Sequence, residues 1–181
     1  AGASVSFLVT ALDRDSGRQV WEYELAAKGG LQRFHEKHNL ASSSPVTDGE
    51  RVYAWFGSGQ IVALATNGEL VWERHLGEEY APFTINWGHG SSPVVYGDTL
   101  ILLCYHERAS YLLGLDAVTG EVRWKVDRGR GVISYSTPLI VETGESAEII
   151  VNSSEGISGH DPATGELLWR VAEDNRFPIP M

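Results

Sequence analysis

The stretch Leu115–Trp124, which reads LDAVTGEVRW, decides the fold of this chain. Three further stretches repeat it: LDRDSGRQVW at Leu12–Trp21, LATNGELVW at Leu64–Trp72 and HDPATGELLW at His160–Trp169. In every copy a glycine precedes the tryptophan by four residues, and successive tryptophans are 51, 52 and 45 residues apart. A period of this size is typical of repeat architectures and predicts an all-β fold, a β-propeller of four-stranded antiparallel blades.

A second repeated phrase lies between the copies of the first. Ser43–Gly49 reads SSPVTDG, Ser91–Gly97 reads SSPVVYG, and a weaker copy begins at Ser136. Each is followed by two β-rich runs before the next Gly-to-Trp phrase, so we predict four strands in each unit. The clearest unit is expected to contain strands at 92–97, 98–106, 110–115 and 121–126.

The unit boundaries follow from the two phrases. An incomplete ring would expose two sheet faces and unpaired strand edges, which is an aggregation hazard. We therefore expect this chain to be a piece of a longer protein, or to be completed by another chain. The alternative is a closed four-bladed ring in which residues 4–25 pair with the C-terminal strand. The predicted propeller segment, 1–181, contains a partial blade at 1–25 with strands near 4–13 and 18–25, blades at 43–76, 91–127 and 136–172, and the start of a next blade at 177–181.

Each Gly-to-Trp phrase is predicted to close the hairpin between the third and fourth strands of a blade. Asp116 and Asp161 can accept a backbone N–H two residues further on, and the glycine then supplies the positive φ of a bulged hairpin. The second copy contains Asn67-Gly68, which favours a two-residue type I′ turn. We expect the tryptophans to cover the seams between blades. The repeat residues with this structural role are Trp21, Trp72, Trp124, Trp169, Gly17, Gly68, Gly120, Gly165, Asp13, Asp116 and Asp161.

Composition and charge exclude some classes of function. The chain has 181 residues and a net charge of −10, and an acidic chain repels phosphate backbones, so we expect no nucleic-acid partner. No segment approaches the roughly 20 apolar residues of a membrane span. Cys104, the only cysteine, lies in the apolar run Leu100–Tyr105, where we expect it to be buried.

The phrases Leu115–Trp124 and Asp161–Trp169 resemble the tryptophan-docking repeat of the pyrroloquinoline-quinone-like β-propellers. The resemblance covers about residues 4–176, and four copies in register make it specific for the fold. It implies an eight-bladed ring, of which this chain, with about three full blades and two partial ones, is half. The superfamily includes quinoprotein alcohol dehydrogenases, the propeller lipoprotein of the bacterial outer-membrane barrel assembly machinery, and many other envelope proteins, so the fold alone does not assign a function.

The enzyme branch of this superfamily has its own signature. The resemblance implies that a quinone-binding member would carry a disulfide between adjacent cysteines and Glu, Asn and Asp ligands to calcium. This chain has a single cysteine, and no acidic cluster near a strand start matches the calcium site. We therefore expect no cofactor; pyrroloquinoline quinone with calcium belongs only to the alternative in which the chain is part of an oxidoreductase.

The segments that enter the first strand of each blade are the places where a ligand or partner site is expected. Register places His38, Asn39, Trp87, His89 and Tyr135 just before these strands, around one mouth of the central channel. One hypothesis is a polar funnel that binds a small ligand or a metal, because histidine suits both roles. The other interpretations are residues that cap strand ends beside a solvated channel, and a protein-binding face.

The function favoured by these observations is a non-enzymatic scaffold that mediates protein–protein interaction in a bacterial cell envelope. The resemblance implies a periplasmic or other envelope location, and a protein partner or the remainder of a ring. The alternatives are part of a quinoprotein oxidoreductase, and a ligand-sensing propeller domain.

Overall fold

The structure, a computed structural model, describes residues 5–29, 35, 39–85, 87–144, 146–175 and 178. The described residues form one two-stranded and three four-stranded antiparallel sheets, with one short helix, α1 (Leu76–Glu79). The two-stranded sheet pairs β1 (Ser6–Leu12) with β2 (Gln19–Ala26). The next sheet contains β3 (Val46–Thr47), β4 (Arg51–Trp55), β5 (Gln60–Ala65) and β6 (Leu70–His75). The last two contain β7 (Val94–Tyr96), β8 (Thr99–Tyr105), β9 (Ser110–Asp116) and β10 (Val122–Asp127), and then β11 (Leu139–Thr143), β12 (Ser146–Ser153), β13 (Gly156–His160) and β14 (Leu167–Ala172).

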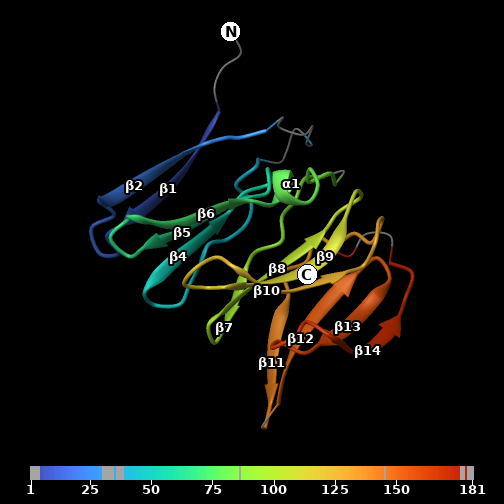
Figure 1. Ribbon diagram of the computed structural model, residues 1–181. Coiled ribbons are helices and arrows are strands. Elements are labelled where there is room, and N and C mark those ends of the chain that lie inside the picture. The colour runs from blue at the N-terminus through green and yellow to red at the C-terminus, as the bar shows by residue number, and fades with distance from the viewer. Residues whose placement is uncertain are drawn as a thin grey trace.

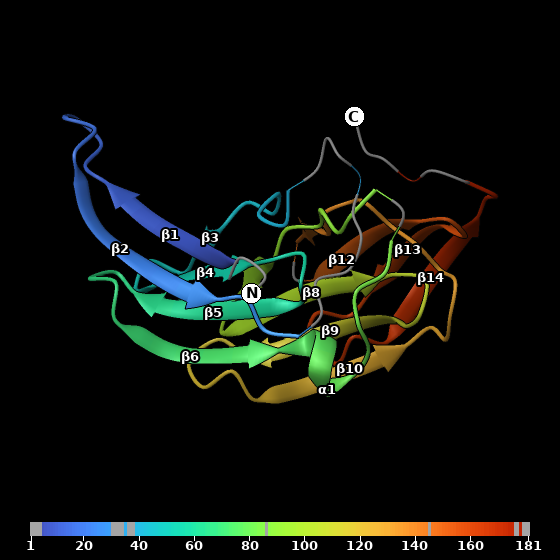
Figure 2. The same ribbon diagram turned by 90° about the horizontal axis from the view of Figure 1, so that it is seen from above.

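The sheets follow one another in chain order around an arc. Within each four-stranded sheet, strands that are consecutive in sequence are hydrogen-bonded neighbours. Figure 1 shows the sheets side by side, and Figure 2 shows the arc from above, with β1–β2 at one end and β12–β14 at the other. In Figure 2, β3 and β4 lie nearer the concave side and β6 lies on the convex side. The chain is therefore all-β, with the radial arrangement of propeller blades.

The closed four-bladed ring is wrong for the described residues. β1 and β2 form a sheet of their own, and β14 pairs only with β13. The two lie at opposite ends of the arc (Figure 2), because two complete sheets stand between the β1–β2 hairpin and the last sheet. Of the predicted start of a next blade at 177–181, only Pro178 lies within the described residues.

Three apolar clusters join the sheets face to face. All seven residues of β8 are buried, which explains the unbroken apolar run Leu100–Tyr105 in its sequence. Leu100 and Leu102 pack toward the β3–β6 sheet, in a cluster with Tyr53 and Trp72. The alternate residues of β8, which point to the other face, join a second cluster with residues of the β11–β14 sheet. A third cluster joins the β1–β2 hairpin to β4 and β5.

Cys104 is buried and free, as its apolar neighbours predict. Burial raises the pKa of the Cys104 thiol. No helix in the described part of the chain is long and apolar enough to span a bilayer.

The type I′ turn expected at Asn67-Gly68 is wrong. That turn needs a positive φ at both central residues, yet every described residue with positive φ is a glycine. Gly68 has φ +88, and its N–H donates to the carbonyl of Ala65 at 2.8 Å. The shorter copy thus closes in the same way as the others, with a glycine in the left-handed region at a bulge in the β5–β6 pairing.

Candidate functional site

One contact joins successive blades at three places. The Nε1–H of Trp72 donates to the carbonyl of Ala117 at 3.1 Å, and its indole lies against Gly120 in the turn of the next blade. A Cβ on Gly120 would stand 2.7 Å from the Trp72 ring, so only glycine fits there. The corresponding acceptor and glycine are Thr66 and Gly68 for Trp21, and Pro162 and Gly165 for Trp124.

The aspartates of the phrase hold these turns in shape. Asp116 Oδ1 accepts the backbone N–H groups of Val118 and Thr119, at 2.9 and 2.8 Å. The N–H of Gly120 donates to the Asp116 carbonyl at 2.8 Å. Asp161 accepts the equivalent pair of amides, so the same turn presents its second residue's carbonyl to an indole in both blades. The Asx turns that the sequence predicts at both aspartates are present.

The sequence interpretation missed the residues on the other side of each indole. Trp124 lies opposite Gly114 on the neighbouring strand, and Trp169 lies opposite Gly159. The equivalent positions opposite Trp21 and Trp72 hold alanines, Ala11 and Ala63. The signal in the sequence is a glycine or alanine nine or ten residues before each tryptophan, since a larger side chain would occupy the space of the ring.

Trp169 differs from the other three tryptophans. It is 38% exposed, against 8% for Trp72 and 9% for Trp124. Its Nε1–H donates to Oε2 of Glu148, in its own blade, at 2.6 Å. None of the described turns packs against its ring, because β14 lies at the end of the arc.

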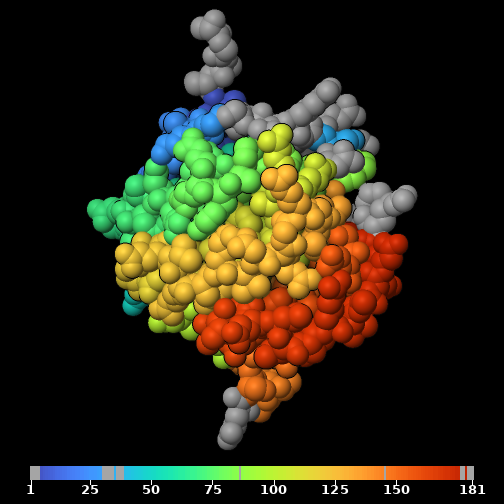
Figure 3. Space-filling model, turned by 45° about the vertical axis from the view of Figure 1, so that its right-hand side comes forward, coloured from blue at the N-terminus to red at the C-terminus, as the bar shows by residue number. Residues whose placement is uncertain are grey.

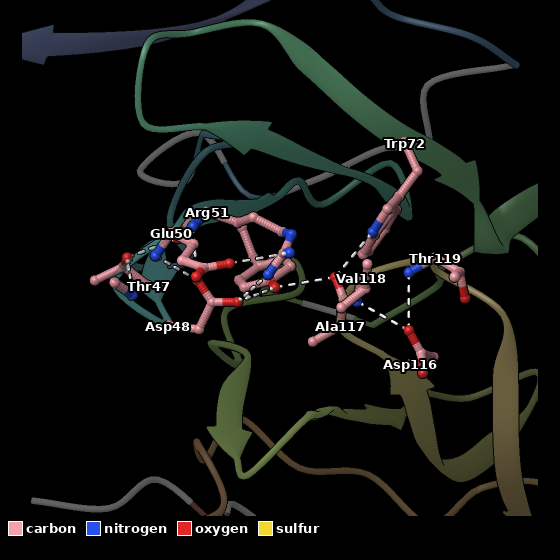
Figure 4. Close-up of polar contacts among 11 residues, drawn as sticks. Thr47, Asp48, Glu50, Arg51, Trp72, Asp116, Ala117, Val118 and Thr119 are labelled. Carbon is pink, nitrogen blue, oxygen red and sulfur yellow. Dashed lines mark hydrogen bonds and ion pairs between the residues drawn. The ribbon is translucent and has the colours of Figure 1, made fainter.

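The sequence interpretation also missed a polar network at the junction between the β3–β6 sheet and the β7–β10 sheet (Figure 4). The Tyr53 hydroxyl lies 2.7 Å from Oδ2 of Asp48 and 3.0 Å from the carbonyl of Ala117, which also accepts the indole N–H of Trp72. Arg51 donates to Asp48 Oδ2 at 2.8 Å. Burial alone would raise the pKa of Asp48, but the hydrogen bonds from Tyr53 and Arg51 outweigh it and hold that pKa at about 2. Through Tyr53 the network connects Asp48 in one blade to Ala117 in the next, so its role is structural.

The Ser-Ser-Pro phrase joins the blades at their first strands. The Ser43 hydroxyl donates to the carbonyl of Ser91 at 2.8 Å, and the Ser44 amide donates to the Ser92 hydroxyl at 2.9 Å. The Ser92 amide in turn donates to Thr137 Oγ1 at 3.0 Å. These hydroxyls recur because each one links its blade to the same position in the next blade.

Pro178 continues this series. The Ser136 hydroxyl donates to the Pro178 carbonyl at 3.1 Å, as the Ser43 hydroxyl donates to Ser91. The amide of Tyr135 also lies 3.4 Å from the same carbonyl. Pro178 therefore accepts a hydrogen bond from Ser136 as Ser91 does from Ser43.

The structure brings together only part of the predicted channel mouth. Trp87 is 45% exposed and lies against His35, with ring centroids 4.3 Å apart. Tyr135 is half-buried; burial raises its pKa, and a hydrogen bond with the Trp87 backbone opposes that rise. Asn39 is exposed, and its Oδ1 accepts the amide of Ala41 at 2.9 Å, so it shapes a turn. His38 lies outside the described residues.

His89 belongs to the core and not to the mouth. It is 2% exposed and packs on the rings of Trp55 and Phe83, with centroids 4.2 and 5.0 Å away. Its Nε2 lies 3.3 Å from the carbonyl of Leu103. His106 stacks on the same Phe83 ring, with centroids 4.6 Å apart, and burial lowers its pKa to about 4. Of the five residues predicted at the mouth, His89 is therefore buried in the core.

The described residues contain no group of three or more His, Cys, Asp or Glu side chains arranged to hold a metal ion. Cys104, the one cysteine of the sequence, is buried and free, so these 181 residues hold no pair of adjacent cysteines such as the quinoprotein resemblance would require. The mouth offers an aromatic surface in which Trp87 is exposed and His35 and Tyr135 are half-buried. The absence of a cofactor stays a prediction.

Comparisons with known proteins bear on this arrangement. The family model described as outer membrane protein assembly factor BamB matches residues 6–176. The outer membrane protein assembly factor BamB of Yersinia pestis is 26% identical over 174 residues, which are 90% of this chain and 38% of that protein. The protein of the same name from Moranella endobia is 28% identical over 169 residues, 90% of this chain and 39% of that protein. The chain thus spans about two fifths of the length of these relatives.

Solved structures show the same fold. BamB from Moraxella catarrhalis superposes with a TM-score of 0.62 at 21% identity, over 93% of this chain and 47% of that one. A quinohemoprotein alcohol dehydrogenase from Comamonas testosteroni gives a TM-score of 0.64 at 16% identity, over 92% of this chain and 32% of that one. Both similarities concern the propeller fold alone.

Proposed function

Because this chain belongs to the family described as outer membrane protein assembly factor BamB, we propose that it is a propeller scaffold that serves outer-membrane protein assembly in a bacterial cell envelope. It acts by binding protein partners and carries out no chemistry of its own. The observation that carries the proposal is the family match over 6–176, which includes all three complete sheets and the hairpin before them.

The structure supports this role through the rigidity of its framework. Hydrogen bonds and apolar clusters fix each blade on the next, both at the indole and at the Ser-Ser-Pro phrase. The segments that connect the blades are held at their ends by this framework. A connecting segment on a rigid scaffold is the usual place for a binding surface.

The binding surface that we propose is the channel mouth. Trp87 is a large aromatic side chain, nearly half exposed, next to His35 and Tyr135. Aromatic side chains of this kind are enriched in protein interfaces, where tryptophan and tyrosine supply much of the binding free energy. Because the relatives are named outer membrane protein assembly factors, we expect the partner to be a protein of that assembly process.

Site-specific photocrosslinking tests the proposal. The chain is expressed in the periplasm of a Gram-negative bacterium with benzoylphenylalanine in place of Trp87 or, as a control, in place of Glu142. Glu142 is also exposed but lies at the other end of the blade, near the β11–β12 turn. We expect crosslinks to outer-membrane assembly proteins from position 87 only. Equal crosslinking at both positions, or none, would contradict the proposed surface.

The competing function is part of a quinoprotein oxidoreductase. The quinohemoprotein alcohol dehydrogenase structure supports it only at the level of the fold. Pyrroloquinoline quinone and calcium are added to the purified chain, and the absorbance spectrum and dye-linked alcohol oxidation are recorded. The scaffold proposal expects an unchanged quinone spectrum and no turnover; tight binding with turnover would replace it.

A further inference from the structure

Asn67-Gly68 is a chemically reactive dipeptide at one of the blade junctions. Asn67 is the only asparagine of the sequence that a glycine follows, and asparagine is a thermolabile residue. In the other three copies of the Gly-to-Trp phrase a hydroxyl residue precedes the glycine, and these residues are Ser16, Thr119 and Thr164. A hydroxyl side chain has no amide to lose. The β5–β6 turn is therefore the only one of the four in which the residue before the glycine can deamidate.

The reaction of this dipeptide needs only water. The backbone nitrogen of Gly68 attacks Cγ of Asn67 and closes a cyclic imide, and the side-chain nitrogen leaves as ammonia with the proton of the Gly68 amide. Water then opens the ring. Cleavage of the bond from the nitrogen to Cγ gives aspartate, and cleavage of the bond to the backbone carbonyl carbon gives isoaspartate, in which the chain runs through Cβ and Cγ. Glycine favours the attack because it has no side chain that hinders its nitrogen.

In the closed turn, hydrogen bonds hold both of the reacting groups. The Gly68 amide donates to the carbonyl of Ala65 at 2.8 Å. The Glu69 amide donates to Oδ1 of Asn67 at 3.1 Å, and Nδ2 of Asn67 donates to Oε2 of Glu69 at 3.0 Å. The attack requires the Gly68 nitrogen to lose its proton and the Asn67 side chain to turn toward that nitrogen. These hydrogen bonds oppose both changes, so the closed turn protects Asn67.

Trp21 holds this turn closed from the neighbouring hairpin. Its Nε1–H donates to the carbonyl of Thr66 at 2.8 Å, and a Cβ on Gly68 would stand 2.7 Å from its ring. The indole thus contacts the residues on both sides of Asn67, while Asn67 itself is exposed to water. Figure 3 shows the blue surface of the β1–β2 hairpin directly beside the green surface of β6. The protection of Asn67 therefore depends on the contact between two blades.

We propose that Asn67 is a site of spontaneous deamidation and that the Trp21 junction controls the rate of this reaction. While the indole lies on Gly68, the turn stays closed and Asn67 is preserved. Folded proteins open locally as well as globally, and a local opening that moves the β1–β2 hairpin off the β3–β6 sheet frees the turn. The dipeptide then reacts, so the amount of product records how often this junction opens.

Either product makes the opening permanent. Isoaspartate adds a CH2 group to the backbone between residues 67 and 68, which moves Gly68 from its place against the Trp21 ring. Aspartate replaces Nδ2, which donates to Glu69, by an oxygen, so two carboxylates face each other. This inference is independent of the proposed function, because neither Trp87 nor a protein partner takes part in it.

Mass spectrometry of the tryptic peptide that contains Asn67 tests the proposal. Cleavage after Arg51 and Arg74 releases this peptide as Val52–Arg74. The folded chain, the urea-unfolded chain and folded Trp21→Ala are incubated in mildly alkaline buffer, and the fraction of peptide with a carboxyl in place of the amide is followed over time. An isoaspartyl methyltransferase then labels the isoaspartate. The rate follows the population of the open turn, so we expect Trp21→Ala to react about tenfold faster than the folded wild type, and the unfolded chain to react faster still.

Three control variants separate the Trp21 contact from a general loss of stability. Trp124→Ala loosens a junction that does not contact Asn67, so its rate should stay at the wild-type value. Asn67→Ser should show no change of mass in this peptide. Circular dichroism checks that each variant is folded. If Trp21→Ala does not fold, Trp21→Phe decides, because it keeps a ring for Gly68 but loses the hydrogen bond to Thr66, and we expect it to react faster than the wild type.

Three results would overturn the proposal. The first is an equal rate of deamidation in the folded and the unfolded wild-type chains. The second is a wild-type rate in a folded Trp21 variant. The third is the same acceleration in Trp124→Ala as in the Trp21 variant, which would mean that the contact with the indole of Trp21 does not control the reaction.

Discussion

The junction glycine Gly120 offers a direct test of how the blades are joined. In Gly120→Ala, the new Cβ would stand 2.7 Å from the Trp72 ring, on a residue with φ +74. An alanine in the left-handed region costs about 1–2 kcal/mol, and forcing an extra methyl group into a packed contact costs about 1–3 kcal/mol more. We expect the free energy of unfolding to fall by about 2–5 kcal/mol.

Gly129→Ala is the matched control. Gly129 has φ +80, and no described atom outside its chain neighbours lies within 4 Å of its Cβ position. This variant meets the backbone strain but not the indole, so we expect a loss of about 1–2 kcal/mol. The difference between the two variants, about 1–3 kcal/mol, isolates the contact with Trp72.

Urea unfolding followed by far-ultraviolet circular dichroism measures both variants. The signal reports the sheets directly and does not depend on tryptophan fluorescence, which the Gly120 variant itself would change. Equal losses for Gly120→Ala and Gly129→Ala would mean that Trp72 does not press on the turn of the next blade. The account of the blade junction would then be refuted.

Three further predictions concern buried groups. The pKa of His106 falls to about 4 from 6.5 in the folded chain, so the unfolded chain takes up the proton first as the pH falls. The stability that is present above pH 6.5 is lost as the pH falls to about 4, and the loss is about 3 kcal/mol. His106→Leu should abolish this loss in urea unfolding measured at several pH values. The pKa of Asp48 falls to about 2 from 3.8, so Asp48 contributes about 1–2 kcal/mol to the free energy of unfolding above pH 3.8, and this contribution disappears toward pH 2. Asp48→Asn should show the loss already at pH 7. An unchanged midpoint of urea unfolding would contradict the network around Tyr53. Cys104, fully buried and with a raised pKa, should not react with an aromatic disulfide reagent in the native chain and should release one thiol per chain in urea; rapid native labelling would show that the core opens locally.

The strands and turns could be predicted because the interactions that form them are local. The strand expected at 98–106 is β8, Thr99–Tyr105, and that expected at 121–126 is β10, Val122–Asp127. An aspartate that binds amides two and three residues further on, and a glycine that alone tolerates positive φ, specify a turn whatever packs around it. The exception is Asn67-Gly68, where the turn is centred on Thr66 and Asn67 and Gly68 follows it with positive φ, because the dipeptide suits both this turn and the type I′ turn.

The sequence by itself determined the repeat, the four-stranded unit and the tryptophans that lie at the junctions between blades. Only the tertiary structure decided which side chains are buried. Trp124 and Trp169 end the same phrase, yet one is covered by the next blade and the other lies open at the end of the arc. His89 and Trp87 are two residues apart in one loop, but Trp55 and Phe83 enclose the first and leave the second exposed. Turns depend on hydrogen bonds between near neighbours in the chain, whereas burial depends on the surfaces that distant segments bring against a residue.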